Sequence, residues 1–111
     1  MLIFALTIFT LVAIMGLGLA LDVFKGVGSP IIFARIHALL ALIGSALVIA
    51  AALGGDNRVW INIGLAVVII GLGILISFRR QKGLPVKGLA ALHGSLAVAC
   101  YGILGYIVIA G

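Results

Sequence analysis

Apolar residues fall into four long runs along the chain, separated by three short polar segments. Each run reaches roughly the 20 residues that a helix needs to cross a hydrocarbon core about 30 Å thick. Glycine, proline and charged residues mark the breaks between runs, as is typical of helix ends. The pattern predicts four membrane-spanning helices, over Leu2–Phe24, Ile31–Leu53, Val59–Phe78 and Val86–Ala110.

The short polar segments carry signals for helix starts. Ser29 is expected to cap the second helix, with Pro30 in its first turn. Asp56 or Asn57 is the expected cap of the third helix, and the third segment repeats the order of glycine and then proline. Short connections favour antiparallel neighbours. The sequence therefore predicts an all-α membrane protein, folded as an up-down-up-down four-helix bundle.

The two halves of the chain resemble each other. Ile14–Phe24 (IMGLGLALDVF) matches Ile69–Arg79 (IIGLGILISFR), and in each half a basic turn and a helix with one histidine follow. The matching glycines of the two repeats are one residue closer together in the chain than the two histidines are. This difference predicts one extra residue in the second turn. We interpret the chain as one bundle of two tandem two-helix repeats, residues 1–55 and 56–111. A chance match between two apolar sequences is the alternative.

Composition indicates that lipid is the main solvent of this chain. It is 66% hydrophobic and 8% charged, whereas about a quarter of the residues in a soluble domain are charged. The net charge is +5, but the basic residues lie at the ends of apolar runs, which is typical of membrane proteins. Nucleic acid is therefore not an expected partner. A single cysteine excludes an internal disulfide.

The basic residues also predict the orientation of the chain. All but Arg58 lie in or beside the first and third turns; they are Lys25, Arg35, Arg79, Arg80, Lys82 and Lys87. By the positive-inside rule, these two turns are cytoplasmic and both termini are outside. The chain is expected to be a multi-pass protein of a bacterial inner (plasma) membrane.

The chain has two histidines, at matching places in the two repeats. At 1.5 Å per residue, His37 and His93 lie roughly 10 and 12 Å along their helices from the preceding prolines. The same rise places Gly16 and Gly71 roughly 9 and 12 Å from the charged ends of their helices. All four positions are expected in one layer, on the cytoplasmic side of the membrane centre. Ionisable residues at such depth are costly and usually functional.

Two imidazoles on diagonal helices of a bundle can ligate one metal centre between them. Diagonal helices lie about 11–14 Å apart, given about 8–10 Å between neighbours. A flat macrocycle in that gap would project toward the other two helices, where glycine leaves room. This arrangement predicts one haem b, with His37 and His93 as axial ligands and with Gly16 and Gly71 beside the ring.

Basic residues at the same end are candidates to bind the two haem propionates. They are Arg35, Arg79, Arg80 and Lys87. The positive-inside rule alone would also place them there, so this interpretation stays open. The histidines have alternatives too: transport of haem, a metal or protons, or helix–helix hydrogen bonds in a haem-free anchor subunit. The glycines, in turn, have the alternative of ordinary packing between membrane helices.

The histidine pair on facing helices resembles membrane b-type cytochromes, broadly the b561-like four-helix group. That group uses four ligands to hold two haems, one near each face, whereas His37 and His93 are two and lie toward one face. The resemblance implies a minimal cytochrome that holds one haem. A six-coordinate iron leaves no open position, which favours one-electron transfer over catalysis. The expected partners are the lipid bilayer, a quinone or redox protein, and a second copy of the chain as a further candidate.

Overall fold

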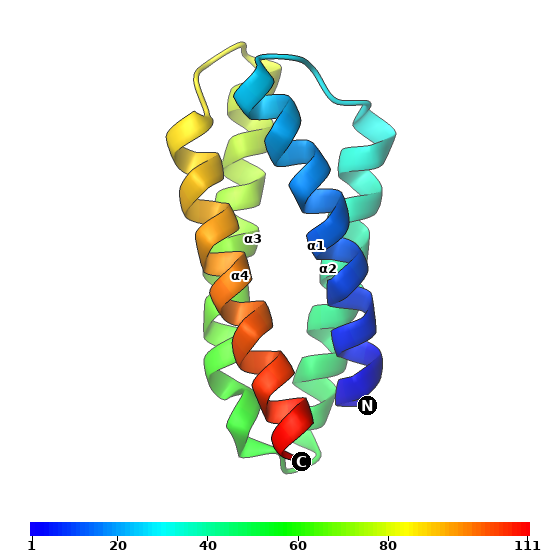
Figure 1. Ribbon diagram of the computed structural model, residues 1–111. Coiled ribbons are helices and arrows are strands. Elements are labelled where there is room, and N and C mark those ends of the chain that lie inside the picture. The colour runs from blue at the N-terminus through cyan, green and yellow to red at the C-terminus, as the bar shows by residue number, and fades with distance from the viewer.

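Four long helices form one up-down-up-down bundle in the computed structural model, which describes all 111 residues (Figure 1). They are α1 (Leu2–Lys25), α2 (Ile31–Leu53), α3 (Trp60–Gln81) and α4 (Lys87–Ala110), and a short 3-10 helix, η1 (Asn57–Val59), leads into α3. Each long helix is long and apolar enough to cross a membrane. The predicted fold class is confirmed.

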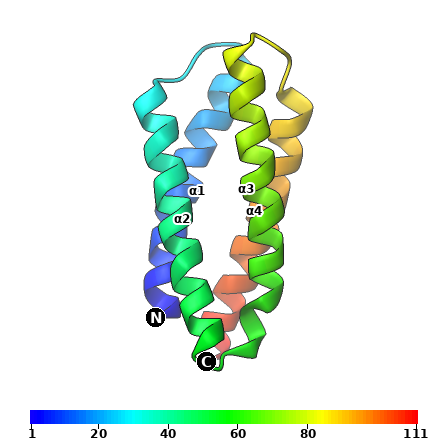
Figure 2. The same cartoon turned by 180° about the vertical axis from the view of Figure 1, so that it is seen from behind.

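The helices follow each other around the bundle in chain order. Helix α1 packs against α2 and α4, and α3 packs against α4 and, more loosely, against α2. No Cα atoms of α1 and α3, or of α2 and α4, come within 8 Å of each other, so these are the diagonal pairs. Segments 26–30 and 82–86 form one end of the bundle, the turn end. Both termini and segment 54–56 form the other, the terminal end (Figures 1 and 2).

Close packing is confined to the two ends of the bundle. At the terminal end the buried cluster comprises Ala5, Val48, Ala52, Val59, Leu104 and Ile107. A smaller cluster at the turn end comprises Val23, Val86 and Ala90. Between these clusters, the α1–α2 hairpin and the α3–α4 hairpin lie further apart in both views (Figures 1 and 2). The fold therefore joins two hairpins at their ends.

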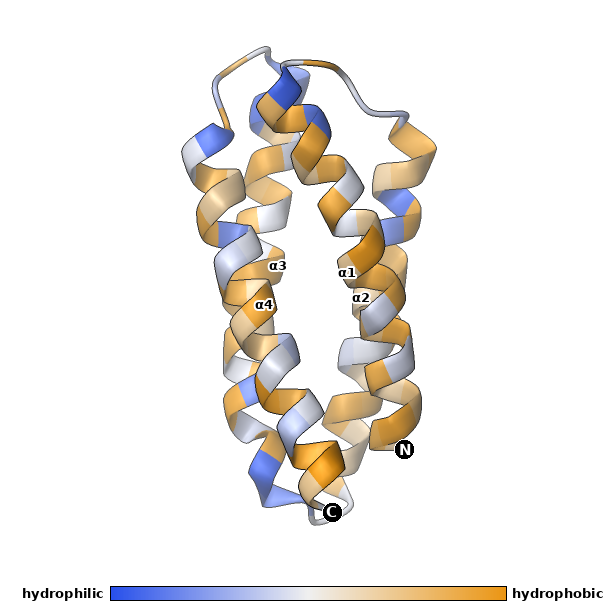
Figure 3. Cartoon of the chain, in the orientation of Figure 1, coloured by the Kyte–Doolittle hydropathy of each residue, from blue (hydrophilic) through white to orange (hydrophobic).

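The outer surface of the bundle is apolar over most of its length. Only 11 of 111 residues are buried, and large apolar side chains such as Ile14 and Ile109 are 65% and 87% exposed. Soluble monomers rarely expose continuous apolar surface of this extent. The hydrophilic residues gather mostly at the two ends of the bundle (Figure 3). These are the features of a multi-pass membrane protein.

Helices α1 and α3 end in the same way. Gly26 and Gly83 follow them in the left-handed conformation, with φ of 73° and 70°, which glycine adopts without steric cost. The amide after each glycine bonds back five residues, at 3.0 and 2.9 Å, as in a Schellman cap. Helix α3 continues beyond the predicted Phe78 to Gln81, because arginine and glutamine are good helix formers.

The start of α2 differs from the sequence expectation. Pro30 is the N-cap residue and α2 begins at Ile31, so the prediction that Ser29 caps this helix is wrong. The Ser29 hydroxyl instead donates to Asp22 Oδ2 at 2.8 Å. Its oxygen accepts a hydrogen bond from Arg80 at 3.1 Å. This hydroxyl therefore ties the first turn to the end of α3 rather than satisfying amides of α2.

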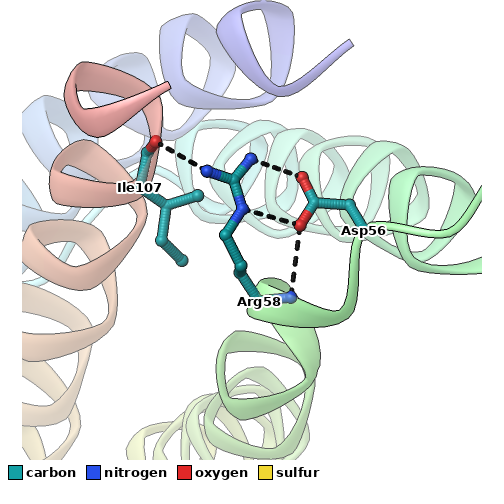
Figure 4. Close-up of polar contacts among 3 residues, drawn as sticks. All are labelled: Asp56, Arg58 and Ile107. Atoms are coloured by element: carbon teal, nitrogen blue, oxygen red, sulfur yellow. Dashed lines mark hydrogen bonds and ion pairs between the residues drawn. The ribbon is translucent and has the colours of Figure 1, made fainter.

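At the other end, Asp56 caps η1, the 3-10 helix that leads into α3, whereas the N-cap residue of α3 itself is Val59. Asp56 accepts a hydrogen bond from the Arg58 amide at 3.2 Å and binds the Arg58 guanidinium through Nε and NH2 at 2.9 and 2.8 Å (Figure 4). Arg58 also donates to the Ile107 carbonyl at 3.5 Å, near the end of α4. The Arg58 hydrogen bonds hold the pKa of Asp56 below its ordinary value. Asp56 is therefore charged at neutral pH and neutralises the one basic side chain at the terminal end.

The two hairpins correspond in structure, but in a different register from the one expected. The offset between the helix-ending glycines, Gly26 and Gly83, is one residue larger than the offset between His37 and His93. The segment from the helix-ending glycine to the histidine is therefore one residue shorter in the second repeat, while the turns 26–30 and 82–86 are equal in length, so the prediction of an extra residue in the second turn is wrong. The Gly-Leu-Gly match of the sequence is two residues out of structural register.

Candidate functional site

An internal cavity of about 1530 Å³ lies between the two packed ends of the bundle. All four long helices line it, and most of the lining side chains are apolar. Small-molecule pockets commonly measure about 300–1,000 Å³, so this cavity has room for a large ligand. Both histidines line it, His37 from α2 and His93 from α4. The structure thus brings the two predicted ligands to one internal space, from diagonal helices.

The ring of His93 is oriented by the neighbouring helix α3. Its Nδ1 lies 2.8 Å from the backbone carbonyl oxygen of Ile69. A carbonyl oxygen can only accept, so Nδ1 carries the hydrogen and donates it. Nε2 then keeps a free lone pair; it makes no hydrogen bond and is not buried. Histidine ligands of metals typically have this arrangement, with one nitrogen donating to a carbonyl and the other free to ligate.

The ring of His37 occupies the corresponding place against α1. Its Nδ1 is buried, and the Val12 carbonyl beside it does not complete a hydrogen bond. Its Nε2 is also unbonded and not buried. Val12 corresponds to Ile69 in the register that the helix-ending glycines set. The two rings are therefore placed by equivalent groups of the two repeats.

A glycine makes room for each imidazole. A Cβ atom at Gly16 would lie 3.0 Å from Cε1 of His37, and one at Gly73 would lie 3.2 Å from Cε1 of His93. Each glycine follows by four residues the carbonyl that faces the imidazole, which is about one helical turn. One turn of α1 or α3 thus supplies both the acceptor and the space for a ring.

Gly71, the second glycine expected beside the macrocycle, lies elsewhere. No atom lies within 4 Å of the position its Cβ would take, and Gly71 does not line the cavity. Gly73 occupies the place expected for Gly71. The structure aligns α3 with α1 two residues away from the alignment that the Gly-Leu-Gly sequences suggest. A comparison that started from Gly26 and Gly83 would have found it, since both are glycines that follow a lysine.

The basic residues expected near the propionates divide into two groups. Arg35 lines the histidine cavity. Arg79 and Lys87 line a separate cleft between the two turns. Arg80, at the end of α3, borders both spaces. Of the predicted cations, Arg35 and Arg80 are therefore the ones that share a cavity with the histidines.

Buried polar contacts hold the terminal half of the cavity wall together. Asn62, only 3% exposed, donates from Nδ2 to the Cys100 carbonyl at 2.9 Å and so ties α3 to α4. The hydroxyls of Thr10 and Tyr101 are 2.7 Å apart and tie α1 to α4. No three histidine, cysteine or acidic side chains converge anywhere in the chain.

Comparisons with protein-family models, with characterised proteins and with solved structures find no match for this chain. The geometry of the two repeats is therefore the basis on which a function can be inferred.

The hydrogen bond to Ile69 predicts the tautomer of His93. In protein labelled with ¹⁵N-imidazole and studied in detergent with no ligand added, we expect Nδ1 of His93 to be protonated and Nε2 to be unprotonated. The His37→Ala variant isolates the His93 signals. A His93 spectrum with the hydrogen on Nε2 would contradict this orientation of the ring.

Proposed function

We propose that the chain is a membrane-embedded b-type haem protein, a minimal cytochrome b, in which His37 and His93 are the axial ligands of one haem. The observation that carries this proposal is the pairing of the two rings in one cavity. Each repeat contributes one histidine, on diagonal helices, with Nδ1 toward a backbone carbonyl and Nε2 free. For His93, ligation through Nε2 needs no change of tautomer, because the hydrogen lies on Nδ1.

The cavity suits haem b in chemistry as well as in size. Its apolar walls match the porphyrin ring, and its volume of about 1530 Å³ exceeds that of ordinary ligand pockets. Arg35 and Arg80 border it and can bind carboxylates with two parallel hydrogen bonds. The bound group would supply one-electron redox chemistry at its iron. Two axial ligands from the protein fill the coordination sphere, which favours electron transfer over activation of a substrate.

The residues around the ligands have positioning roles in this proposal. Gly16 and Gly73 allow the imidazoles to lie against α1 and α3. The Ile69 carbonyl holds the His93 ring and, by accepting its hydrogen, makes Nε2 a better donor to a metal. A quinone or a redox protein at the membrane surface is the proposed electron partner.

Ligation by both histidines predicts the spectrum and stoichiometry of the purified protein. We expect about one haem per chain, with the low-spin spectrum of a bis-histidine iron in both oxidation states. His37→Ala and His93→Ala should each give a high-spin or easily lost haem, and the double variant should bind none. The measurement is a haem titration followed by absorption spectroscopy in detergent.

Free imidazole provides the control for this prediction. In the His93→Gly variant, added imidazole should restore the low-spin spectrum, because it can replace the missing ligand in the cavity. If both single alanine variants keep a full low-spin spectrum, ligation by His37 and His93 within one bundle is wrong. A transport or structural role for the histidines then becomes the better explanation.

The close approach of ring and backbone predicts different effects for glycines of one helix. Gly73→Leu should lower haem occupancy per folded chain several-fold, because a side chain there collides with the His93 ring, and Gly16→Leu should do the same at His37. Gly71→Leu is the matched control: it lies two residues from Gly73 and faces open space. Equal occupancy in the Gly71 and Gly73 variants would contradict the proposed role of Gly73.

We also propose that the turn end faces the cytoplasm, in the inner membrane of a bacterium. Of the basic side chains, all but Arg58 belong to this end. Arg58, at the terminal end, is paired with Asp56, whereas Asp22 at the turn end bonds to the Ser29 hydroxyl and forms no ion pair. Six basic side chains and Asp22 therefore give the turn end a positive excess, whereas Arg58 and Asp56 cancel at the terminal end, and this difference favours the orientation.

The orientation can be measured with reporter fusions. A reporter active only outside the cytoplasm should be active after Gly111 and inactive after Lys82, in the third turn; a cytoplasmic fluorescent reporter should show the reverse. Asp56→Asn should weaken this bias, because it leaves Arg58 unpaired. Cytoplasmic fluorescence of the fusion after Gly111 would contradict the proposed topology.

A further inference from the structure

A second space, separate from the histidine cavity, lies at the turn end. It is an open cleft of about 1010 Å³ between the first and third turns, the two loops at the top of Figure 1. Three basic side chains line it, those of Arg79, Arg80 and Lys87, together with apolar ones such as Leu84 and Leu89. No acidic residue lines it. Its composition is therefore cationic and partly apolar.

Hydrogen bonds hold the two arginines in place without neutralising them. Nε of Arg79 donates to the Pro85 carbonyl at 3.2 Å, and its two terminal nitrogens have no partner. The Arg80 guanidinium donates to the Ser29 hydroxyl and to a backbone carbonyl, at 3.1 and 3.0 Å. The one acid at this end, Asp22, accepts from Ser29 and pairs with no cation. Asp22 therefore reaches Arg80 only through the Ser29 hydroxyl, and the three cations leave the cleft with a net positive charge that hydrogen bonds fix in position.

The first turn of α4 adds backbone donors to the same wall. Lys87, Gly88 and Leu89 line the cleft, and their amides have no backbone acceptor. The N-cap residue, Val86, supplies no side-chain acceptor either. These amides lie at the positive end of a 24-residue helix. Beside the three cations of the cleft, they suit an oxyanion that has several acceptor oxygens.

We propose that this cleft binds the phosphate group of an anionic phospholipid. The fixed positive charge selects an anion, and the position of the cleft selects a lipid. Helix α1 ends at Lys25 and α3 at Gln81, so the cleft lies where the apolar helices give way to polar turns, the level of the lipid headgroups. Leu84 and Leu89 in its wall suit the glycerol and the upper acyl chains. The proposal does not rest on haem binding, since Arg79 and Lys87 line only the cleft.

Lipid retention by variants of equal net charge tests the site. The probe is phosphatidylglycerol, titrated onto the full chain in neutral detergent and followed by native mass spectrometry, with zwitterionic phosphatidylcholine for comparison. Arg79→Gln with Lys87→Gln should weaken retention of phosphatidylglycerol about tenfold or more, as expected for two lost contacts to an anionic headgroup. Lys25→Gln with Lys82→Gln removes the same charge from the same end, outside the cleft. That control should change retention by no more than about twofold, through general electrostatics.

Three results would overturn the proposal. They are equal losses in the two double variants, equal retention of phosphatidylcholine, and displacement of the lipid by millimolar inorganic phosphate, which would indicate a site for a free anion. The single variant Lys87→Gln serves as a second test that should not disturb folding, because the Lys87 side chain makes no hydrogen bond within the protein. It should weaken retention more than Lys82→Gln, whose side chain is also free of hydrogen bonds; equal effects of the two would count against the cleft.

Discussion

A polar group in hydrocarbon must find its partner within the protein, because lipid offers neither donors nor acceptors. For the imidazoles of this bundle, the partners are helix carbonyls. Nδ1 of His93 donates to Ile69, and this bond fixes which nitrogen is left without a hydrogen. The ring lies against α3 at Gly73, where a Cβ atom would come within 3.2 Å of Cε1 and force the ring to shift. The need for a hydrogen-bond partner within the protein therefore explains the tautomer of His93, the position of its ring and the glycine beside it. The site depends on this requirement.

The internal cavity follows from how the two hairpins meet. Apolar clusters close the bundle at its ends, one at the terminal end and a smaller one at the turn end. In the middle, small residues and the two imidazoles face the interior and leave about 1530 Å³ between the helices. A water-soluble bundle would lose hydrophobic stabilisation from such a void. A lipid-facing bundle with a large apolar ligand in this space would recover those contacts.

The turn end carries two kinds of anion-binding chemistry in this interpretation. Arg35 and Arg80 border the histidine cavity, whereas Arg79 and Lys87 face the cleft between the turns. Arg80 borders the cleft as well, so of these neighbouring arginines of α3 only Arg79 is confined to one space. Successive residues of a helix point about 100° apart, which gives the two side chains different surroundings. The one nearby carboxylate, Asp22, reaches Arg80 only through the Ser29 hydroxyl, and the six basic side chains leave this end with a net positive charge.

Periodicity and composition were sufficient to predict four spanning helices, a two-hairpin repeat, the basic turn end and the histidine pair, because each depends on residue type and on distance along a helix. The tertiary structure alone decided the register between repeats. It placed Gly73 rather than Gly71 against a ring, removed Ser29 from its expected cap, and separated the cations into two spaces. The physical reason is that such choices depend on contacts between helices. An error of two residues in the alignment moves a side chain about 200° around the helix. Two similar apolar sequences do not show which of these alignments is correct.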